Sequence, residues 1–300
     1  MSVHFEKLKS LEPRKEFFVG IDSDGCAFDT MEIKHKECFI PNIINSWDLQ
    51  AASRFAREAA EFVNLYSQWR GINRFPGLVM VFDLLAEWDE PVARGFVPPR
   101  IESLRKWIQG EKHLGNPALE AAVARTGDPV LTRTLAWSRA VNETVERFVR
   151  GVPPFPFVRE SLEALTARAD MMVVSATPGE ALAREWQEHD LARFARLICG
   201  QEMGGKSEHL KYAAGGKYEP ANVLMIGDAP GDLKAAKANG FLFYPVNPGH
   251  EEASWQRFHD EAASRFFAGE YAGDYENSLT EEFMSYLPSS PPWKKPTPTA

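Results

Sequence analysis

Two pairs of carboxylates follow apolar runs of the sequence. Asp22 and Asp24 come directly after one run, and Asp228 and Asp232 come after another. Residues two apart at the end of an extended strand point the same way, so Asp22 and Asp24 are expected to face one space. If the second pair lies beside the first, four negative charges meet, which is tolerable only around a cation. Hard carboxylate oxygens with room left for water and phosphate favour Mg²⁺.

Two further positions have the chemistry to bind a phosphate. Ser175 and Ala176 follow another apolar run, where a hydroxyl and the backbone N–H groups near a helix start can hold a phosphate oxygen. Lys206 follows two glycines just before a helical stretch and can bring a positive charge to the same phosphate. Each signal alone has an ordinary alternative, because Ser caps many helices, Lys is usually a surface residue, and acidic pairs suit polar turns and helix starts.

The elements that must position these residues are expected to form an α/β fold. Five short apolar runs bounded by turn residues read as buried strands. They cover residues 17–21, 171–174, 197–199, 223–226 and 241–246. Amphipathic stretches between them, at 158–169, 179–195, 207–214 and 231–239, predict crossover helices on both faces of a Rossmann-like parallel sheet. Such a sheet gathers the carboxyl ends of its strands at one edge, where open α/β sheets bind ligands.

The long segment between the first two predicted strands has apolar residues at helical spacing and no convincing strand. We therefore expect an all-helical cap insert at residues 30–156 within an α/β core of residues 1–29 and 157–250. Arg70 and Arg74 flank a predicted turn in this insert, where a guanidinium could pair with a second anionic group of a substrate. The alternative for both is an arginine that is solvated or paired with local acids.

The C-terminal part of the chain is expected to differ from the core. Residues 251–287 have a helical pattern and predict a C-terminal extension, and residues 288–300 form a proline-rich tail. The composition of this tail favours polyproline or disordered structure, either solvated or loosely docked.

Composition excludes several classes of protein. The 300 residues contain 34 Lys and Arg against 42 Asp and Glu, a net charge of −8 that repels nucleic acid. No stretch resembles a cleavable leader or a membrane-spanning helix. The three cysteines, Cys26, Cys38 and Cys199, are odd in number and lack CxxC spacing, so neither a disulfide framework nor a zinc site is indicated. We expect a cytoplasmic protein with no membrane partner, whose oligomeric state the sequence does not indicate.

In order and placement, these four signals resemble the motifs of the haloacid dehalogenase superfamily of hydrolases. That family has Asp-x-Asp after the first strand, Ser or Thr after the second, Lys near a later helix start, and an acidic pair after the fourth. Here the matching residues are Asp22 with Asp24, Ser175, Lys206, and Asp228 with Asp232. The stretch 24–35 is also similar to members with a helical cap inserted after the first motif. One departure is Cys26, a helper position where the family usually has Thr or Val.

The resemblance implies an Mg²⁺-dependent phosphatase that acts on a small phosphorylated metabolite. Asp22 would attack phosphorus to give an aspartyl-phosphate, and Asp24 would serve as general acid and then as general base. The acid at Asp24 favours phosphate esters over the dehalogenating and phosphonate-cleaving members of the family.

The resemblance also implies how the phosphoryl group is held. Mg²⁺ would be bound by Asp22, the backbone carbonyl of Asp24, and Asp228, with Lys206 and Ser175 adding to the neutralisation of charge. Asp232 would orient Lys206 or a water on the metal.

Three alternatives stay open. A phosphomutase of the same superfamily shares every motif and differs in keeping its intermediate. Residues Gly200 to Ser207 also fit the P-loop pattern GxxxxGK[ST]. Against a P-loop stand the negative charge of Glu202, the late position in the chain, and the fact that Asp22 and Asp24 stay unexplained. A non-catalytic scaffold on the same fold is the third alternative, since fold does not imply activity.

Overall fold

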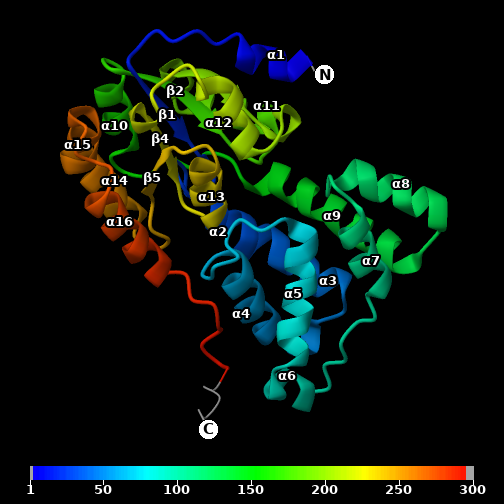
Figure 1. The fold of residues 1–300 in the computed structure, drawn as a ribbon. Coiled ribbons are helices and arrows are strands. Elements are labelled where there is room, and N and C mark those ends of the chain that lie inside the picture. The colour runs from blue at the N-terminus through cyan, green and yellow to red at the C-terminus, as the bar shows by residue number, and fades with distance from the viewer. Residues whose placement is uncertain (1–2, 295–300) are drawn as a thin grey trace. The chain divides into compact units, whose positions relative to one another are not determined.

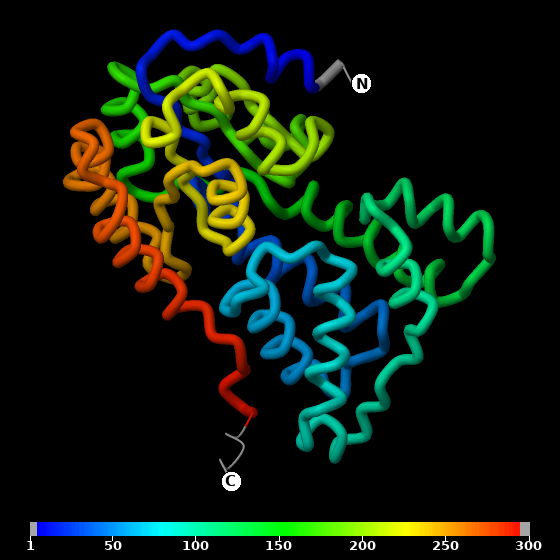
Figure 2. The backbone as a smooth tube through the Cα atoms, viewed as in Figure 1, coloured from blue at the N-terminus to red at the C-terminus, as the bar shows by residue number. Residues whose placement is uncertain are grey.

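The computed structural model describes residues 3–294, which fall into two compact units. The sheet unit comprises the chain up to Met31 and Gly151–Tyr286, and the helical unit comprises Glu32–Arg150 and the chain from Leu287 onward. The backbone therefore passes between the units three times (Figure 2). The sequence places the boundaries of the insert at 30 and 156 and treats residues 288–300 as a separate tail, whereas the structure groups the start of that tail with the helices.

The sheet unit contains five parallel strands in the order β3-β2-β1-β4-β5. The strands are β1 (Phe17–Ile21), β2 (Ala169–Val174), β3 (Ala195–Cys199), β4 (Val223–Gly227) and β5 (Leu242–Pro245). β1 lies between β2 and β4, with Phe18 opposite Asp170 on one side and Val223 on the other. All five apolar runs of the sequence thus became strands, and the α/β fold class is confirmed.

Helices cover both faces of this sheet. The helices of the sheet unit are α1 (Val3–Lys9), α2 (Thr30–Ile33, which spans the unit boundary), α10 (Val158–Leu165), α11 (Gly179–Glu188), α12 (Lys206–Ala214), α13 (Pro230–Ala238), α14 (Glu251–Arg257), α15 (Ala263–Ala268) and α16 (Asp274–Ser285). Figure 1 shows α12 and α13 side by side on one face and α10, α14 and α15 on the other. The second face is sealed by a core that includes Val19, Leu162, Trp255 and Phe266.

Three predicted helical stretches differ in extent or continuity from the helices of the structure. The stretch 179–195 stops at Glu188 because the chain turns at Asp190, where φ is +53°, before β3 begins. The stretch 158–169 stops at Leu165 because Ala169 already pairs with β1. The extension at 251–287 is divided by a π-helical turn at Phe258–Ala262 and by a bend after Gly269, where φ is +76°.

The helical unit is built from helices and loops, and residues 32–150 contain no strand in the part of the chain that the structure describes. Its elements are the π-helix η1 (Lys34–Phe39), α3 (Ile40–Ser46), the 3₁₀ turn η2 (Gln50–Ala52), α4 (Ser53–Asn64), α5 (Arg74–Ala86), α6 (Asp89–Ala93), α7 (Glu102–Gly110), α8 (Asn116–Thr126) and α9 (Pro129–Phe148). It has its own core, which includes Phe62, Phe82, Leu104 and Trp137. Asn73 caps α5 by accepting from the Phe75 N–H, which gives the turn predicted between Arg70 and Arg74 a local cause, and Asp128 caps α9 in the same way.

The first residues of the proline-rich tail are anchored on the helical unit. The Trp293 indole stacks on the Trp88 indole with ring centroids 4.2 Å apart, and it meets the Phe62 ring edge-on at 5.7 Å. The Gln68 N–H donates to the Pro288 carbonyl at 3.3 Å, and Lys294 pairs with Glu87. The prediction for residues 295–300 of the tail lies outside the described residues. No helix within residues 3–294 is both long and apolar enough to cross a membrane.

Replacing Trp293 by Ala is expected to destabilise the helical unit by about 1–3 kcal/mol, because the half-buried indole loses two aromatic contacts and its apolar area. The measurement is the thermal midpoint followed by near-UV circular dichroism. Lys294→Ala is the matched control, since its pair with Glu87 is more than half exposed and contributes little. Equal midpoints for the two variants would show that the stacked Trp does not anchor the tail.

Candidate active site

The topology of the sheet places the two acidic pairs at one edge. β1 and β4 are neighbours, and the chain reverses its winding direction between them, which is where open α/β sheets form a ligand-binding crevice. Asp22 follows β1, and its N–H donates to the Ile226 carbonyl of β4 at 3.0 Å. Asp228 comes one residue after the end of β4. Pairing of the strands is therefore what brings residues 206 positions apart in the chain together.

Three buried carboxylates form the centre of the site. One oxygen from each of Asp22, Asp228 and Asp232 lies within 4.8 Å of the others. Asp232 is in the first turn of α13, and its Oδ2 accepts from the Ala229 N–H at 3.1 Å, which fixes it at the helix start. The Asp232 side chain lies close to the end of β4, since a Cβ on Gly227 would lie 2.4 Å from the Asp232 carboxyl carbon. Position 227 therefore requires glycine.

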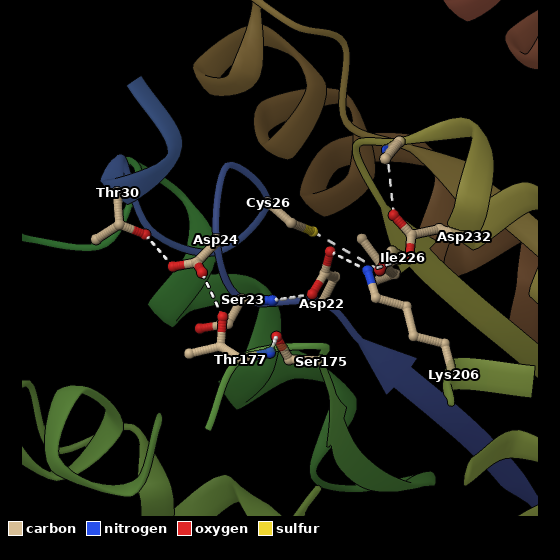
Figure 3. A network of polar contacts seen from close by, with 11 residues as sticks. Asp22, Ser23, Asp24, Cys26, Thr30, Ser175, Thr177, Lys206, Ile226 and Asp232 are labelled. Carbon is tan, nitrogen blue, oxygen red and sulfur yellow. Dashed lines mark hydrogen bonds and ion pairs between the residues drawn. The ribbon is translucent and has the colours of Figure 1, made fainter. Parts of the chain in front are cut away.

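Lys206 bridges two of these carboxylates. Its Nζ lies 2.6 Å from Asp22 Oδ2 and 2.6 Å from Asp232 Oδ1 (Figure 3). Burial alone would lower the pKa of this ammonium, but the two anions beside it raise that pKa well above its usual range, so the residue is a fixed cation. Burial raises the pKa of Asp22 to about 6, with the charge of Asp232 acting in the same direction and that of Lys206 opposing both.

The loop after β1 turns sharply to aim these side chains. The Ser23 carbonyl accepts from the N–H groups of Cys26, Ala27 and Phe28 at 3.2, 2.9 and 3.0 Å. Gly25 has φ of +74°, a conformation that glycine adopts without strain. Ser23 is buried and its N–H donates to Asp22 Oδ1 at 2.8 Å, which orients that carboxylate.

Asp24 points to a different set of partners from Asp22. The Thr30 hydroxyl donates to Asp24 Oδ1 at 2.5 Å, and the Thr177 hydroxyl donates to Asp24 Oδ2 at 2.6 Å (Figure 3). Its carboxylate is not one of the three that form the acidic cluster of Asp22, Asp228 and Asp232. Neither threonine was predicted from the sequence as a partner of Asp24. A signal existed for Thr177, which lies two residues after Ser175 in the same loop.

Ser175 is buried at the end of β2, where its N–H donates to the Cys199 carbonyl of β3 at 3.0 Å. Its Oγ accepts from the Thr177 N–H at 3.2 Å, and the intervening Ala176 is exposed. Cys26 is buried, and burial raises the pKa of its thiol well above the usual range, with Asp228, Asp22 and Asp232 adding to the shift. This thiol is therefore a packing group that stays protonated.

The donor set fits Mg²⁺. Asp22, Asp228 and Asp232 supply hard carboxylate oxygens, all from side chains no more than a few per cent exposed, and concentrated buried negative charge favours a cation. Lys206 offsets part of that charge, but one ammonium does not neutralise three carboxylates. The expected contribution of the Asp24 backbone carbonyl stays a prediction.

The stretch that matches a P-loop has other contacts. Lys206, which would face a nucleotide phosphate in a P-loop, is bonded to two carboxylates. The Glu202 carboxylate accepts from the Gly179 N–H at 3.0 Å, so it lies at the start of α11. A Cβ on Gly200 would lie 2.3 Å from the Gly179 backbone nitrogen, so the backbone of Gly179 occupies the space beside Gly200. These contacts do not favour a phosphate cradle at this stretch.

Arg70 and Arg74 lie in the helical unit, and both have contacts there. The buried Arg70 donates to the Leu65 carbonyl at 2.8 Å. Arg74 donates from Nη1 to the Ser138 hydroxyl at 3.0 Å and to Asn142 Oδ1 at 2.8 Å, which ties α5 to α9. Burial lowers the pKa of Arg74 to about 10, so the guanidinium stays charged at neutral pH. Their role in substrate binding stays a prediction, beside the structural role that these contacts give Arg74.

Replacing Arg74 by Met is expected to lower stability by about 1–3 kcal/mol, because the bonds to α9 are lost from a half-buried position. Thermal unfolding measures this loss. Arg139→Met on α9 is the control, because its pair with Glu120 is about half exposed.

A role of Arg74 in substrate binding adds a separate expectation. In Arg74→Met, KM should rise for an ester with a second anionic group and not for p-nitrophenyl phosphate. Arg74→Met with unchanged stability and unchanged KM would leave both roles without support.

Comparison with known proteins supports this description of the sheet unit. Residues 110–246 match the family model of haloacid dehalogenase-like hydrolases, a span that contains β2 to β5 and Lys206 but not β1. No curated protein matches the chain.

Three solved structures illustrate what the fold is similar to. A predicted phosphoglycolate phosphatase from Haemophilus somnus is 16% identical, with 78% of this chain and 86% of that one covered and a TM-score of 0.43. A haloacid dehalogenase-like hydrolase from Streptococcus pneumoniae is 14% identical, with coverages of 82% and 91% and a TM-score of 0.40. A predicted phosphatase from Clostridium acetobutylicum is 15% identical, with coverages of 77% and 84% and a TM-score of 0.43. Likeness at this level says nothing about what this chain acts on. Residues 110–246 are thus similar to the haloacid dehalogenase-like hydrolases.

Proposed function

We propose that the protein is an Mg²⁺-dependent phosphatase that hydrolyses a small phosphate monoester through an aspartyl-phosphate on Asp22. The observation that carries the proposal is the arrangement of Asp22, which is buried beside two further carboxylates and bonded to Lys206. A nucleophilic carboxylate next to a fixed cation and an acidic cluster suits attack on an anionic phosphoryl group. The family match supports a hydrolase.

In the first step, an Asp22 oxygen forms a bond to phosphorus and the ester P–O bond breaks. Asp24 gives its proton to the departing alkoxide. In the second step, Asp24 takes a proton from water, whose oxygen bonds to phosphorus while the bond to Asp22 breaks. The products are inorganic phosphate and free Asp22, so the enzyme returns to its starting state.

The other residues of the site hold the phosphoryl group. Lys206 offsets negative charge on its oxygens, and Asp232 fixes the position of Lys206. Ser175 donates its hydroxyl, and the exposed Ala176 offers its backbone N–H at the start of the loop. Mg²⁺, when bound by Asp22, Asp228 and Asp232, neutralises the charge that builds up during transfer.

The direct test is a panel of phosphate esters assayed with purified protein and Mg²⁺. We expect turnover of at least one alkyl phosphate, with release of inorganic phosphate. Transfer of the phosphoryl group to a second position of the substrate, with no release of phosphate, would identify the mutase alternative instead. Release that depends on Lys206 but survives loss of Asp22 and requires a nucleotide would favour the P-loop alternative.

Removal of the metal is expected to abolish turnover, because three buried carboxylates are then left with only Lys206 to offset them. Activity is measured after chelation and during titration with Mg²⁺. In Asp228→Asn, the Mg²⁺ concentration for half-maximal activity should rise by more than about 10-fold. Even groups that only orient the ligands of a metal typically cost about that factor in metal affinity when they are replaced. Full activity in the chelated wild type would contradict the metal requirement. Asp274→Asn, an exposed position at the start of α16, serves as the control.

A reducing, cytoplasmic setting is part of the proposal. It is supported by Cys26, Cys38 and Cys199, which are free thiols buried in the structure. A small-molecule ester as substrate fits the net charge of −8, which disfavours a polyanionic partner.

A further inference from the structure

Two threonine hydroxyls hold the carboxylate of Asp24, one on each oxygen. Thr30 is fully buried and begins α2, six residues after Asp24. Thr177 belongs to the loop between β2 and α11, 153 positions away in the chain. Hydroxyl bonds to a carboxylate are strong, and these two are 2.5 and 2.6 Å long. One such bond would leave the carboxylate free to rotate, whereas two from different elements fix its plane.

Thr177 is held in turn by the residues around it. Its N–H donates to Ser175 Oγ at 3.2 Å, and its carbonyl accepts from the Gln201 N–H at 3.0 Å. The backbone of Thr177 is thus tied to the loop that we propose to bind phosphate and to the turn that follows β3. A movement of this loop when it receives a phosphoryl group would be passed to Asp24 through the Thr177 hydroxyl.

We propose that Thr177 and Thr30 are positioning residues for Asp24, and that Thr177 couples the phosphate-binding loop to the general acid. The inference rests on the proposed function and deepens it, since neither residue touches the reacting phosphoryl group in this account. A general acid must be aimed at the leaving oxygen, and small errors in aim cost much of its effect. Threonine suits this task because its β-branched side chain has few rotamers.

The test compares two esters that differ in their need for a general acid. Glycerol 2-phosphate releases a strongly basic alkoxide, whereas p-nitrophenyl phosphate releases a stable phenolate that leaves without a proton. For Thr177→Val, kcat/KM for glycerol 2-phosphate should fall by about 10- to 100-fold. The upper figure equals the smallest contribution typical of general acid catalysis, which is about 100-fold. For p-nitrophenyl phosphate the fall should stay below about 3-fold, because acid catalysis contributes little to that reaction. Thr177→Ser, which keeps the hydroxyl, should recover most of the lost rate, and Thr30→Val should show the same contrast.

A second background separates positioning from general damage. In Asp24→Asn, adding Thr177→Val should change kcat/KM for glycerol 2-phosphate by less than about 2-fold, because the group being positioned is gone. Thermal midpoints of all variants show whether they fold. If the folded Thr177→Val variant loses the same factor on both esters, or loses as much in the Asp24→Asn background, the positioning role is wrong while the phosphatase proposal stands. If the wild type hydrolyses no phosphate ester of the panel, the proposed function fails, and this inference fails with it.

Discussion

Asn in place of Asp22 is expected to abolish turnover, with a fall in kcat on the order of 10⁶-fold, the scale of loss when a covalent nucleophile is removed. The amide cannot attack phosphorus, and it also removes one of the two anions bonded to Lys206. The fold should be retained, since the amide oxygen can still accept from the Ser23 N–H. The measurement is the release of inorganic phosphate from the best ester of the panel.

Asp260→Asn provides the matched control for this experiment. Asp260 is exposed in the π-helical turn before α15 and lies outside the acidic cluster. It undergoes the same change of atoms and charge, so its activity should equal that of the wild type. If Asp22→Asn kept more than a few per cent of wild-type turnover, a covalent mechanism through this residue would be untenable.

Met in place of Lys206 is expected to lower both stability and activity. Asp22 and Asp232, which are 6% and 0% exposed in their side chains, would lose their shared cation. Breaking one partner of a buried ion pair typically costs about 3–5 kcal/mol, because the remaining charge is left without compensation. Removal of charge stabilisation from the phosphoryl group should also reduce kcat by about 10²- to 10³-fold. Unfolding is measured in the presence of a chelator, and turnover in the presence of Mg²⁺.

Lys211→Met is the control, because Lys211 is exposed in the last turn of the same helix. It matches Lys206 in the loss of one ammonium on α12, without the contact to the acidic cluster. Equal unfolding temperatures and equal turnover in the two variants would contradict both roles of Lys206, the stabilisation of the buried carboxylates and the stabilisation of the phosphoryl group.

The sequence predicted the central part of the site because its geometry is set by regular structure. Asp22 and Asp228 each follow a short apolar run, and parallel strands end at one edge of a sheet. Once β1 and β4 are neighbours in the sheet, Asp22 and Asp228 must lie close together. Lys206 was found through two glycines and the start of a helix, which are local signals.

The contacts of Asp24 could not be predicted in the same way. Thr30 and Thr177 reach it as side chains from a short helix and a loop, and no periodicity marks such a meeting. The stacking of Trp293 on Trp88 joins residues 205 apart through a proline-rich segment whose composition favours polyproline or disordered structure. Arg74 was identified as a polar residue at a turn, but its bonds to Ser138 and Asn142 depend on how α5 packs against α9. Tertiary packing, which the sequence pattern does not encode residue by residue, decides all three cases.

The central claim is that Asp22 carries the phosphoryl group, and chemical trapping of that intermediate tests it most directly. The wild-type enzyme is mixed with its best ester and Mg²⁺, quenched in acid, and treated with borohydride, which reduces an acyl phosphate of aspartate to homoserine. Peptide mass spectrometry then locates the reduced residue. We expect homoserine at position 22, present only when ester and Mg²⁺ are both supplied. Reduction at another carboxylate, or none during steady turnover, would contradict the account.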